Sequence, residues 1–260
     1  MRARILAAIP AILLVLVSLW EVVAARCDAT SVPDDAAWTR AAQVVRAQHQ
    51  PGDLIVFAPS WADPVGRLHL GDLIPVEMAA RMDAARYGRI WELSIRGADA
   101  PEVAGLHPVL DQDVDGVRVR RFERAPATVL ADARDALPAA KQEGGRGQVV
   151  VAEVGFTPHR CIQVTPVPGR PVKITMTLPL GTKLVGYAGL ADVFTRRDIR
   201  APGSLAVEIA GKQVAHVTPG VDDGWVRFEA PTTPGTADVT FVASADAPQR
   251  LICFAAEARQ

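Results

Sequence analysis

Residues 171–178 read PVKITMTL, and their strict alternation predicts the class of fold. A lysine or a threonine separates each apolar residue from the next; the apolar residues are Val172, Ile174, Met176 and Leu178. Side chains of a β-strand point alternately to its two faces, so this period of two predicts a strand with one buried face. Such a strand is typical of an antiparallel sheet that packs one face on a core.

The same alternation recurs through the second half of the chain. It is clear at residues 204–209 (SLAVEI) and again around Val239 and Phe241. Pro-Gly and Asp-Gly pairs, which favour turns, separate these stretches and lie at residues 168–169, 202–203, 223–224 and 234–235. Up to nine short strands at this spacing predict an antiparallel β-sandwich, or jelly roll, over residues 148–260.

The sequence changes character at residues 143–147 (EGGRG), where we place a domain boundary. Before this point, helical and strand-like periods alternate. Helical spacing occurs at residues 34–50, 74–85 and 127–141, and strand-like runs occur at residues 53–59, 89–95 and 116–122. This order predicts a small α/β domain with a mainly parallel sheet over residues 28–147.

The N-terminus carries an apolar run that precedes both domains. Arg2 and Arg4 are followed by mostly apolar residues from Ile5 to Ala25. A run of about 20 apolar residues is long enough for a membrane helix, and the preceding basic residues keep the N-terminus cytoplasmic. Cleavage after Ala25 would make the run a signal peptide instead. We therefore expect a membrane anchor or a signal peptide over residues 1–27.

The apolar run also predicts where the protein works. The abundance of Ala, Val, Arg and Pro is typical of a high-GC bacterial gene. An uncleaved run predicts a protein of the bacterial inner membrane that faces the periplasm, and a cleaved run predicts an exported protein.

The three cysteines fit an oxidising compartment. Cys161 lies on an early predicted strand of the sandwich and Cys253 on the last one. Early and last strands of sandwiches often lie side by side, so we predict a disulfide between them with Cα atoms within about 7 Å. A thiol nucleophile at Cys161, next to His159, is the less favoured alternative. Cys27 lies outside this predicted pair, and it could be a free thiol at the membrane surface or pair between chains.

The order of features in residues 38–95 resembles a known family. A helix leads to a Pro-Gly-Asp turn, a strand and a second strand with an Arg-x-Trp; the matching residues are Trp38, Ala41, Ala42, Pro51, Gly52, Asp53, Ala58, Pro59, Arg89, Ile90 and Trp91. The stretch resembles the extracytoplasmic region that follows the last membrane helix of bacterial GT-C glycosyltransferases of the dolichyl-phosphate-mannose mannosyltransferase-like type. Those enzymes carry their catalytic acidic residues between membrane helices, and this chain has one apolar segment. The resemblance therefore implies an extracytoplasmic α/β module without transferase activity.

The second half resembles a galactose-binding-like jelly roll, the fold of many carbohydrate-binding modules. Residues 222–228 (DDGWVRF), followed by a Pro-Gly turn and a strand at 237–243, carry this resemblance. It implies a glycan as one class of ligand, although the same fold also occurs as a structural module.

Trp225 and Arg227 are the leading candidates for ligand binding. If Val226 and Phe228 face the core, Trp225 and Arg227 face outward, where an indole can stack on a sugar. The alternative is a tryptophan that covers the end of the sandwich. In a nearby loop, Arg196 and Arg197 could contact an anionic glycan or a lipid headgroup, or be simply solvated.

Acidic residues gather in the least regular part of the first half, residues 63–77. They include Asp63, Asp72 and Glu77, with His69 among them. A loop at the end of a sheet strand is where α/β proteins usually carry their sites. The spacing matches no metal or acid–base motif, and no G-x-S-x-G or H-E-x-x-H occurs in the chain.

These observations predict a non-catalytic, membrane-anchored envelope protein whose β-sandwich binds a glycan or a partner. One alternative is an envelope enzyme, a hydrolase or a glycosyltransferase relative, that uses residues 63–77 on a glycan. Another is a structural subunit of a membrane complex, beside a polytopic membrane protein. We expect no catalytic residue, metal or cofactor, and the net charge of −1 argues against nucleic acid as a partner.

Overall fold

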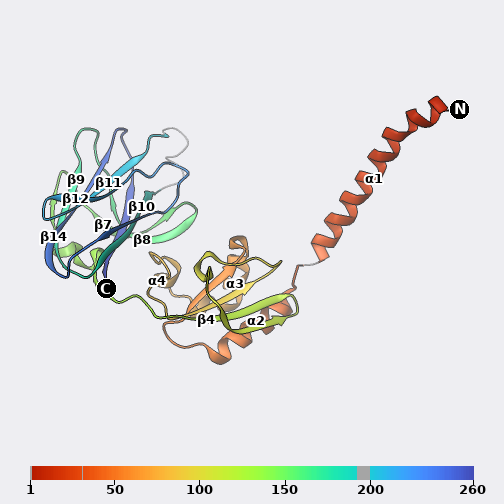
Figure 1. The fold of residues 1–260 in the computed structure, drawn as a ribbon, viewed down its shortest axis with the longest axis horizontal. Helices are drawn as coiled ribbons and strands as arrows, with labels where there is room; N and C mark the ends of the chain where they lie inside the picture. The colour runs from red at the N-terminus through yellow and green to blue at the C-terminus, as the bar shows by residue number, and fades with distance from the viewer. Residues whose placement is uncertain (1, 31, 192–199) are drawn as a thin grey trace. The chain divides into compact units, whose positions relative to one another are not determined.

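The computed structural model describes residues 2–30, 32–191 and 200–260, with side chains from residue 12 onward except at residues 28–30. It divides the chain into two compact units that alternate along the sequence (Figure 1). The first unit is Met1–Leu73 with Arg89–Glu123, and the second is Ile74–Gly88 with Arg124–Gln260. The division at Glu123 therefore differs from the boundary expected at residues 143–147, because the intervening residues supply strands to the sheets of the second unit.

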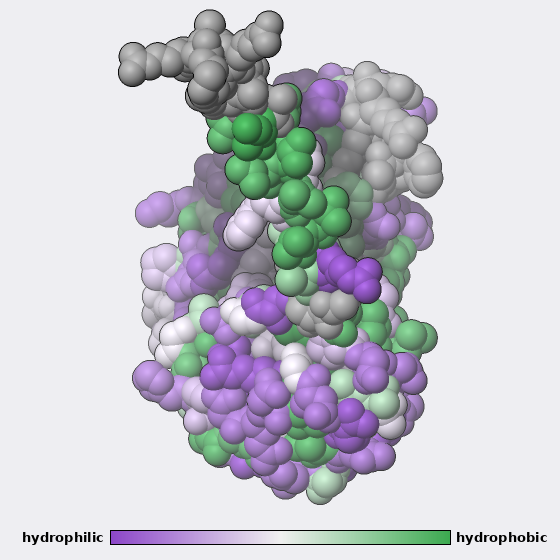
Figure 2. All heavy atoms as spheres, turned by 90° about the vertical axis from the view of Figure 1, so that its right-hand side faces the viewer, coloured by the Kyte–Doolittle hydropathy of each residue, from purple (hydrophilic) through white to green (hydrophobic). Residues whose placement is uncertain are grey.

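The N-terminal segment forms helix α1 (Arg2–Thr30). Its large apolar side chains between residues 12 and 23 are exposed, and Figure 2 shows them as a nearly continuous hydrophobic column. Across the described part of the chain, no helix is both long enough and apolar enough to cross a membrane. The membrane-spanning helix expected in residues 1–27 is therefore not supported.

The first unit combines short helices with one four-stranded sheet. Its helices are α2 (Asp35–Gln48) and α3 (Asp63–Leu70), with short 3-10 turns η1 (Ser60–Ala62), η2 (Gly71–Leu73) and η3 (Pro101–Val103). Its strands are β1 (Leu54–Ala58), β2 (Arg89–Ser94), β3 (Pro108–Val114) and β4 (Val117–Glu123). Asp34 caps α2 by accepting a 2.8 Å hydrogen bond from the Ala37 N–H, and the buried side of α2 follows the predicted helical spacing.

The sheet of the first unit corrects the prediction of a mainly parallel sheet. Its order is β1-β2-β4-β3, and the β1–β2 pairing is parallel whereas β2–β4 and β3–β4 are antiparallel. For the β3–β4 pair the reason is the turn at Asp115 and Gly116, whose φ angles of 53° and 86° are both positive. A two-residue turn of this kind joins antiparallel strands only, since a parallel pair needs a long crossover.

The second unit is a β-sandwich, as the alternation predicts. Beyond helix α4 (Val76–Ala79), its elements run β5 (Val129–Asp132), α5 (Ala133–Ala136), η4 (Leu137–Ala139), β6 (Lys141–Glu143), β7 (Gln148–Val154), β8 (Thr157–Val164), β9 (Val172–Leu180), β10 (Lys183–Leu190), β11 (Gly203–Ile209), β12 (Lys212–Val217), β13 (Val226–Pro231), β14 (Gly235–Ala245) and β15 (Ile252–Arg259). Of the two sheets of the sandwich, the one called the first sheet below has the order β13-β10-β15-β8-β7, with β5 also paired to β15. The second sheet has the order β12-β11-β14-β9-β6. Figure 1 shows the strands of this unit gathered into the sandwich.

Strand β9 carries the stretch from which the fold was predicted. Its alternating apolar residues, Val172 to Leu178, are at most 3% exposed and lie in the core between the two sheets. Phe241 on β14 and Phe254 on β15 stack in the same core with ring centroids 5.0 Å apart. The sandwich therefore buries the positions that the period of two selects.

The predicted disulfide is confirmed. Cys161 on β8 and Cys253 on β15 are bonded, with Cα atoms 5.6 Å apart. The two strands are antiparallel neighbours in the first sheet. Because Ile162 and Phe254 face the core, alternation places the two cysteines on the outer face of this sheet.

Candidate functional site

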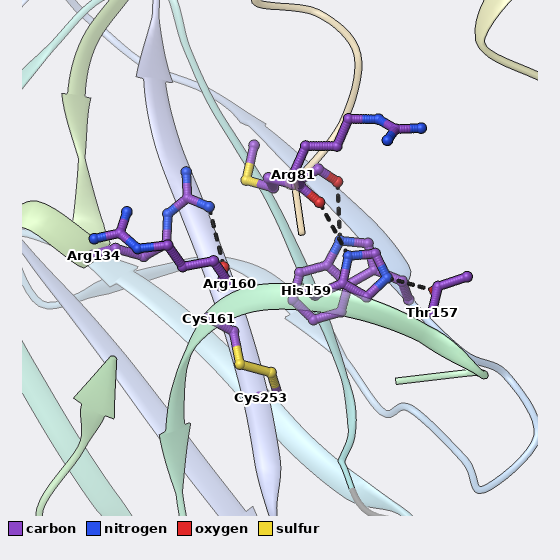
Figure 3. The surroundings of a disulfide bond; sticks show 9 residues. Arg81, Arg134, Thr157, His159, Arg160, Cys161 and Cys253 are labelled. Atoms are coloured by element: carbon purple, nitrogen blue, oxygen red, sulfur yellow. Dashed lines mark hydrogen bonds between the residues drawn. A yellow bond between two sulfur atoms is a disulfide. The ribbon is translucent and has the colours of Figure 1, made fainter. Parts of the chain in front are cut away.

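The outer face of the first sheet is unusual for a sandwich because part of it is closed. All eight residues of β15 are buried, on both faces of the strand. We name the segment Ile74–Gly88 the strap, because it is bound to this face. The Arg160 N–H donates to the Ala80 carbonyl oxygen at 2.7 Å. The His159 Nδ1 lies 3.1 Å from the Arg81 carbonyl oxygen (Figure 3). The strap therefore covers β8 and β15 on the side opposite the core.

Trp225 lies in an aromatic stack under the strap. Its ring stacks on His159, with centroids 4.4 Å apart, and on Tyr187 at 5.9 Å. Its Nε1 donates to the Met82 carbonyl oxygen at 3.1 Å. These are contacts of a packing residue, and the sugar-stacking role of Trp225 stays a prediction.

The other predicted ligand contacts lie elsewhere or outside the described residues. Arg227 is exposed on β13 and pairs with Glu229 two residues along the same strand. Arg196 and Arg197 belong to residues 192–199, which the structure does not describe.

A mostly buried ion cluster, in which Arg86 is 41% exposed, holds the strap to β15 and α5. It contains three arginines and three carboxylates, so its charges balance; its members are Arg86, Arg134, Arg259, Asp83, Asp132 and Glu257. Arg86 donates from the strap to Glu257 at 2.7 Å and to Asp132 at 2.5 Å. Balanced charge and hydrogen-bonded partners are what allow carboxylates to be buried.

Asp132 shows the electrostatics of this cluster. Its side chain is 5% exposed, and burial alone would raise the pKa of its carboxyl group. Hydrogen bonds from Arg134, with the charges of Arg134 and Arg86, outweigh burial and lower that pKa below its ordinary value. Asp132 is therefore ionised at neutral pH, as a structural partner of the arginines.

A small cavity of about 140 Å³ lies beside the ion cluster. Strap residues and sheet residues line it together; they include Glu77, Arg81, Tyr87, Arg134, Arg160 and Glu257. Its lining has four arginines and three carboxylates, so the cavity has no strong excess of either charge.

A larger pocket of about 340 Å³ opens at the other end of this outer face. We name it the polar pocket; its lining is Arg146, Gly147, Gln148, Gln163, Thr165 and Leu251. Gln148 on β7 and Gln163 on β8 are directly opposite each other in the strand register. Leu251 adds an apolar wall and packs against the disulfide cluster. The strand pairing and the disulfide thus hold this pocket in shape.

The polar groups of the polar pocket are open to a ligand. Among the described residues, none hydrogen-bonds or pairs with the side chains of Arg146, Gln148, Gln163 and Thr165. Each glutamine amide can donate two hydrogen bonds and accept two, and the threonine hydroxyl can do both. A volume of this size falls at the lower end of small-molecule sites. Sequence reasoning missed this pocket because its glutamines form no motif and face each other only through the register of the β7–β8 hairpin.

The acidic residues of residues 63–77 do not form one free cluster. Asp63 pairs with Arg67 at 2.5 Å, and both carboxylate oxygens of Asp72 accept from Arg46. Glu77 belongs to the second compact unit, whereas Asp63 and Asp72 belong to the first. The expected alternative of an acidic active site therefore lacks a pair of unengaged carboxylates.

His69, the other residue of this predicted group, lies close to two residues of helix α2. The His69 Nε2 lies 3.3 Å from Asp35, and its Nδ1 lies 3.4 Å from the Thr39 hydroxyl. Throughout the described ranges, no group of three or more His, Cys, Asp or Glu side chains is placed to hold a metal ion.

Taken with the fold, these sites define a disulfide-bridged β-sandwich protein with a strap on one sheet and a polar pocket beside it. No family model matches the chain, and no curated protein matches it significantly.

The solved structures with a likeness to this chain include carbohydrate-binding modules, and these likenesses are distant. One, a CBM51 from Clostridium perfringens GH95 in complex with methyl-galactose, has 11% identity and a TM-score of 0.37 over 50% of this chain and 99% of that one. Another, a CBM6 from Cellvibrio mixtus lichenase 5A in complex with cellotriose, has 17% identity and a TM-score of 0.29 over 51% and 98%. A family 35 module from Clostridium thermocellum has 12% identity and a TM-score of 0.31 over 51% and 98%. Such likenesses are too weak to carry an argument, so the sandwich assignment rests on the sheets described above.

Proposed function

We propose that this protein is a non-catalytic, glycan-binding protein of the bacterial cell envelope, and that the polar pocket is its binding site. The observation that carries the proposal is the set of unengaged groups in that pocket. Two facing glutamine amides and a threonine hydroxyl can match sugar hydroxyls, which are donors and acceptors at once. Leu251 supplies an apolar wall for the C–H face of a sugar ring.

The envelope location has separate support. A disulfide such as Cys161–Cys253 forms and persists in oxidising compartments and is rare in the cytosol. The apolar N-terminal segment, residues 1–27, favours export as a cleaved signal peptide. The non-catalytic part of the proposal is supported by the ion pairs of Asp63 and Asp72, which occupy their carboxylates.

Binding to a glycan array, followed by calorimetry with the full-length protein, tests this function. We expect Gln163→Ala and Gln148→Ala each to weaken glycan binding about tenfold, because a lost hydrogen bond contributes about 1–1.5 kcal/mol. Gln213→Ala is the matched control, since Gln213 is exposed on β12 of the second sheet. The proposal fails if no glycan binds, or if both pocket variants bind as tightly as the unmodified protein.

A further inference from the structure

We infer that the ligand of the polar pocket carries a carboxylate group, as uronic acid sugars do, and that Arg146 binds that group. This inference rests on the proposed glycan-binding function. Arg146 is the one charged residue in the lining of the pocket, so the lining has a net positive charge and no carboxylate.

Among the described residues of the second unit, the Arg146 side chain has no partner, as is also the case for Arg170, which lies outside the polar pocket. Arg86, Arg134 and Arg259 each pair with a carboxylate there. In the part of the chain that the structure describes, no carboxylate or hydrogen-bond acceptor engages the Arg146 side chain. Its guanidinium group can therefore bind an anion without first breaking a protein contact.

The backbone that carries Arg146 is well defined. Arg146 lies in the turn at residues 144–147, between β6 and β7. Gly144 has a φ of 77°, and a Cβ at this position would lie 2.0 Å from the Pro171 carbonyl oxygen. At Gly147, a Cβ would lie 2.7 Å from Ile174, and the Gly147 N–H donates to Gln142 Oε1 at 2.8 Å. Close packing on both sides fixes where Arg146 leaves the turn, which lowers the entropic cost of binding.

The geometry of the side chain favours a carboxylate. A guanidinium group presents paired N–H donors that match the two oxygens of a planar carboxylate. Gln148, Gln163 and Thr165 would remain for the hydroxyls of the same sugar. A neutral sugar offers no counter-charge to Arg146, and a cationic amino sugar would be repelled by it.

Calorimetry with oligosaccharides of galacturonic and glucuronic acid, and with their methyl esters, tests the inference. The methyl ester keeps the sugar hydroxyls and removes the charge. We expect esterification to weaken binding tenfold or more, and Arg146→Gln to weaken binding of the free acid by a similar factor. In Arg146→Gln the acid and its ester should bind alike, because the two changes remove the same contact.

The controls separate this inference from the proposed function. Lys212→Gln removes one positive charge from β12, the edge strand of the second sheet, and should leave binding of the acid unchanged. If Arg146→Gln binds the acid as tightly as before while Gln163→Ala weakens it, glycan binding stands and the role of Arg146 is refuted. Equal affinity for acid and ester in the unmodified protein also refutes it. If none of these sugars binds while neutral glycans do, the carboxylate is wrong; if no glycan binds at all, both proposals fall.

Discussion

Asp132 illustrates, at the scale of single residues, how this protein buries charge. Arg134 donates to both of its carboxylate oxygens, at 2.8 and 2.5 Å, and Arg86 adds a bond from the strap. A buried carboxylate is tolerated when each of its oxygens is engaged, and its loss leaves the arginines uncompensated. Replacing such a residue therefore destabilises the protein mainly because the remaining arginine charges are left without a counter-charge.

Asp132→Asn should destabilise the protein by about 3–5 kcal/mol at neutral pH, because it unbalances the buried ion cluster. Since the folded-state pKa of Asp132 is lowered, its contribution is fully present above the unfolded pKa, about 4, and is lost as pH falls through the folded value. The difference in free energy of unfolding between the variant and the unmodified protein should thus stay constant from neutral pH to about 5 and shrink in stronger acid. Urea unfolding at a series of pH values measures it.

Asp222→Asn is the control for this effect. Asp222 pairs with Arg200, and the two side chains are 74% and 68% exposed. An exposed pair contributes only about 0–1 kcal/mol, so this variant should be nearly neutral at every pH. Equal effects of the two substitutions would show that the ion cluster is solvated in solution.

At the scale of elements, strands β8 and β15 carry the clearest success of sequence reasoning. The order of the predicted strands places Cys161 on an early strand and Cys253 on the last, and the two cysteines add a constraint on which strands are neighbours. The disulfide joins residues 92 apart in sequence. Such a bridge stabilises mainly by limiting the unfolded chain, and longer loops give larger effects.

Removing this bridge by Cys161→Ser with Cys253→Ser should therefore cost about 4–5 kcal/mol in the chain-entropy model. Urea unfolding of the variant, compared with the unmodified protein under oxidising and reducing conditions, measures the loss. Cys27→Ser should change little, because Cys27 forms no disulfide in the described structure. A loss below about 1 kcal/mol would mean that the unfolded chain is already constrained near these residues.

The whole molecule is organised by the alternation of its two units along the chain. The first unit is interrupted at Leu73, the strap joins the second unit, and the chain then returns at Arg89. In consequence the sandwich is completed by residues 124–147 and by the strap. This arrangement differs from a sandwich that begins at residue 148 and folds alone.

A fragment of residues 148–260 is accordingly expected to lack a cooperative unfolding transition, because it loses β5, β6, Asp132 and the strap. A fragment of residues 124–260 should gain stability when a synthetic peptide of residues 74–88 is added. Trp225 fluorescence would report binding, since its indole N–H donates to Met82 of the strap. The Arg86→Ala peptide, which lacks the bonds to Glu257 and Asp132, should bind more weakly. Cooperative unfolding of the 148–260 fragment at the stability of the full chain would contradict this organisation.

Local patterns account for most of the elements that sequence reasoning found. The helical spacing of Trp38, Ala41 and Val45 predicted α2, and the period of two in residues 171–178 predicted β9 and its buried face. These signals need only neighbours in the chain, because a helix or a strand repeats its faces within a few residues. The sequence alone therefore determined the sandwich class and the disulfide.

The tertiary structure decided which surfaces meet. Residues 74–88 have no strand period, yet hydrogen bonds from Arg160 and Trp225 place them on the outer face of the first sheet. Likewise Gln148 and Gln163 form one pocket only because β7 and β8 pair in that register. The strap contacts join segments that are distant in sequence, and they depend on the balance of burial and paired charge across the folded unit. The β7–β8 contact is a hairpin of consecutive strands, and its register sets which side chains face each other. The periodicity of a single segment does not predict these tertiary contacts, so the strap and the polar pocket are seen only in the folded structure.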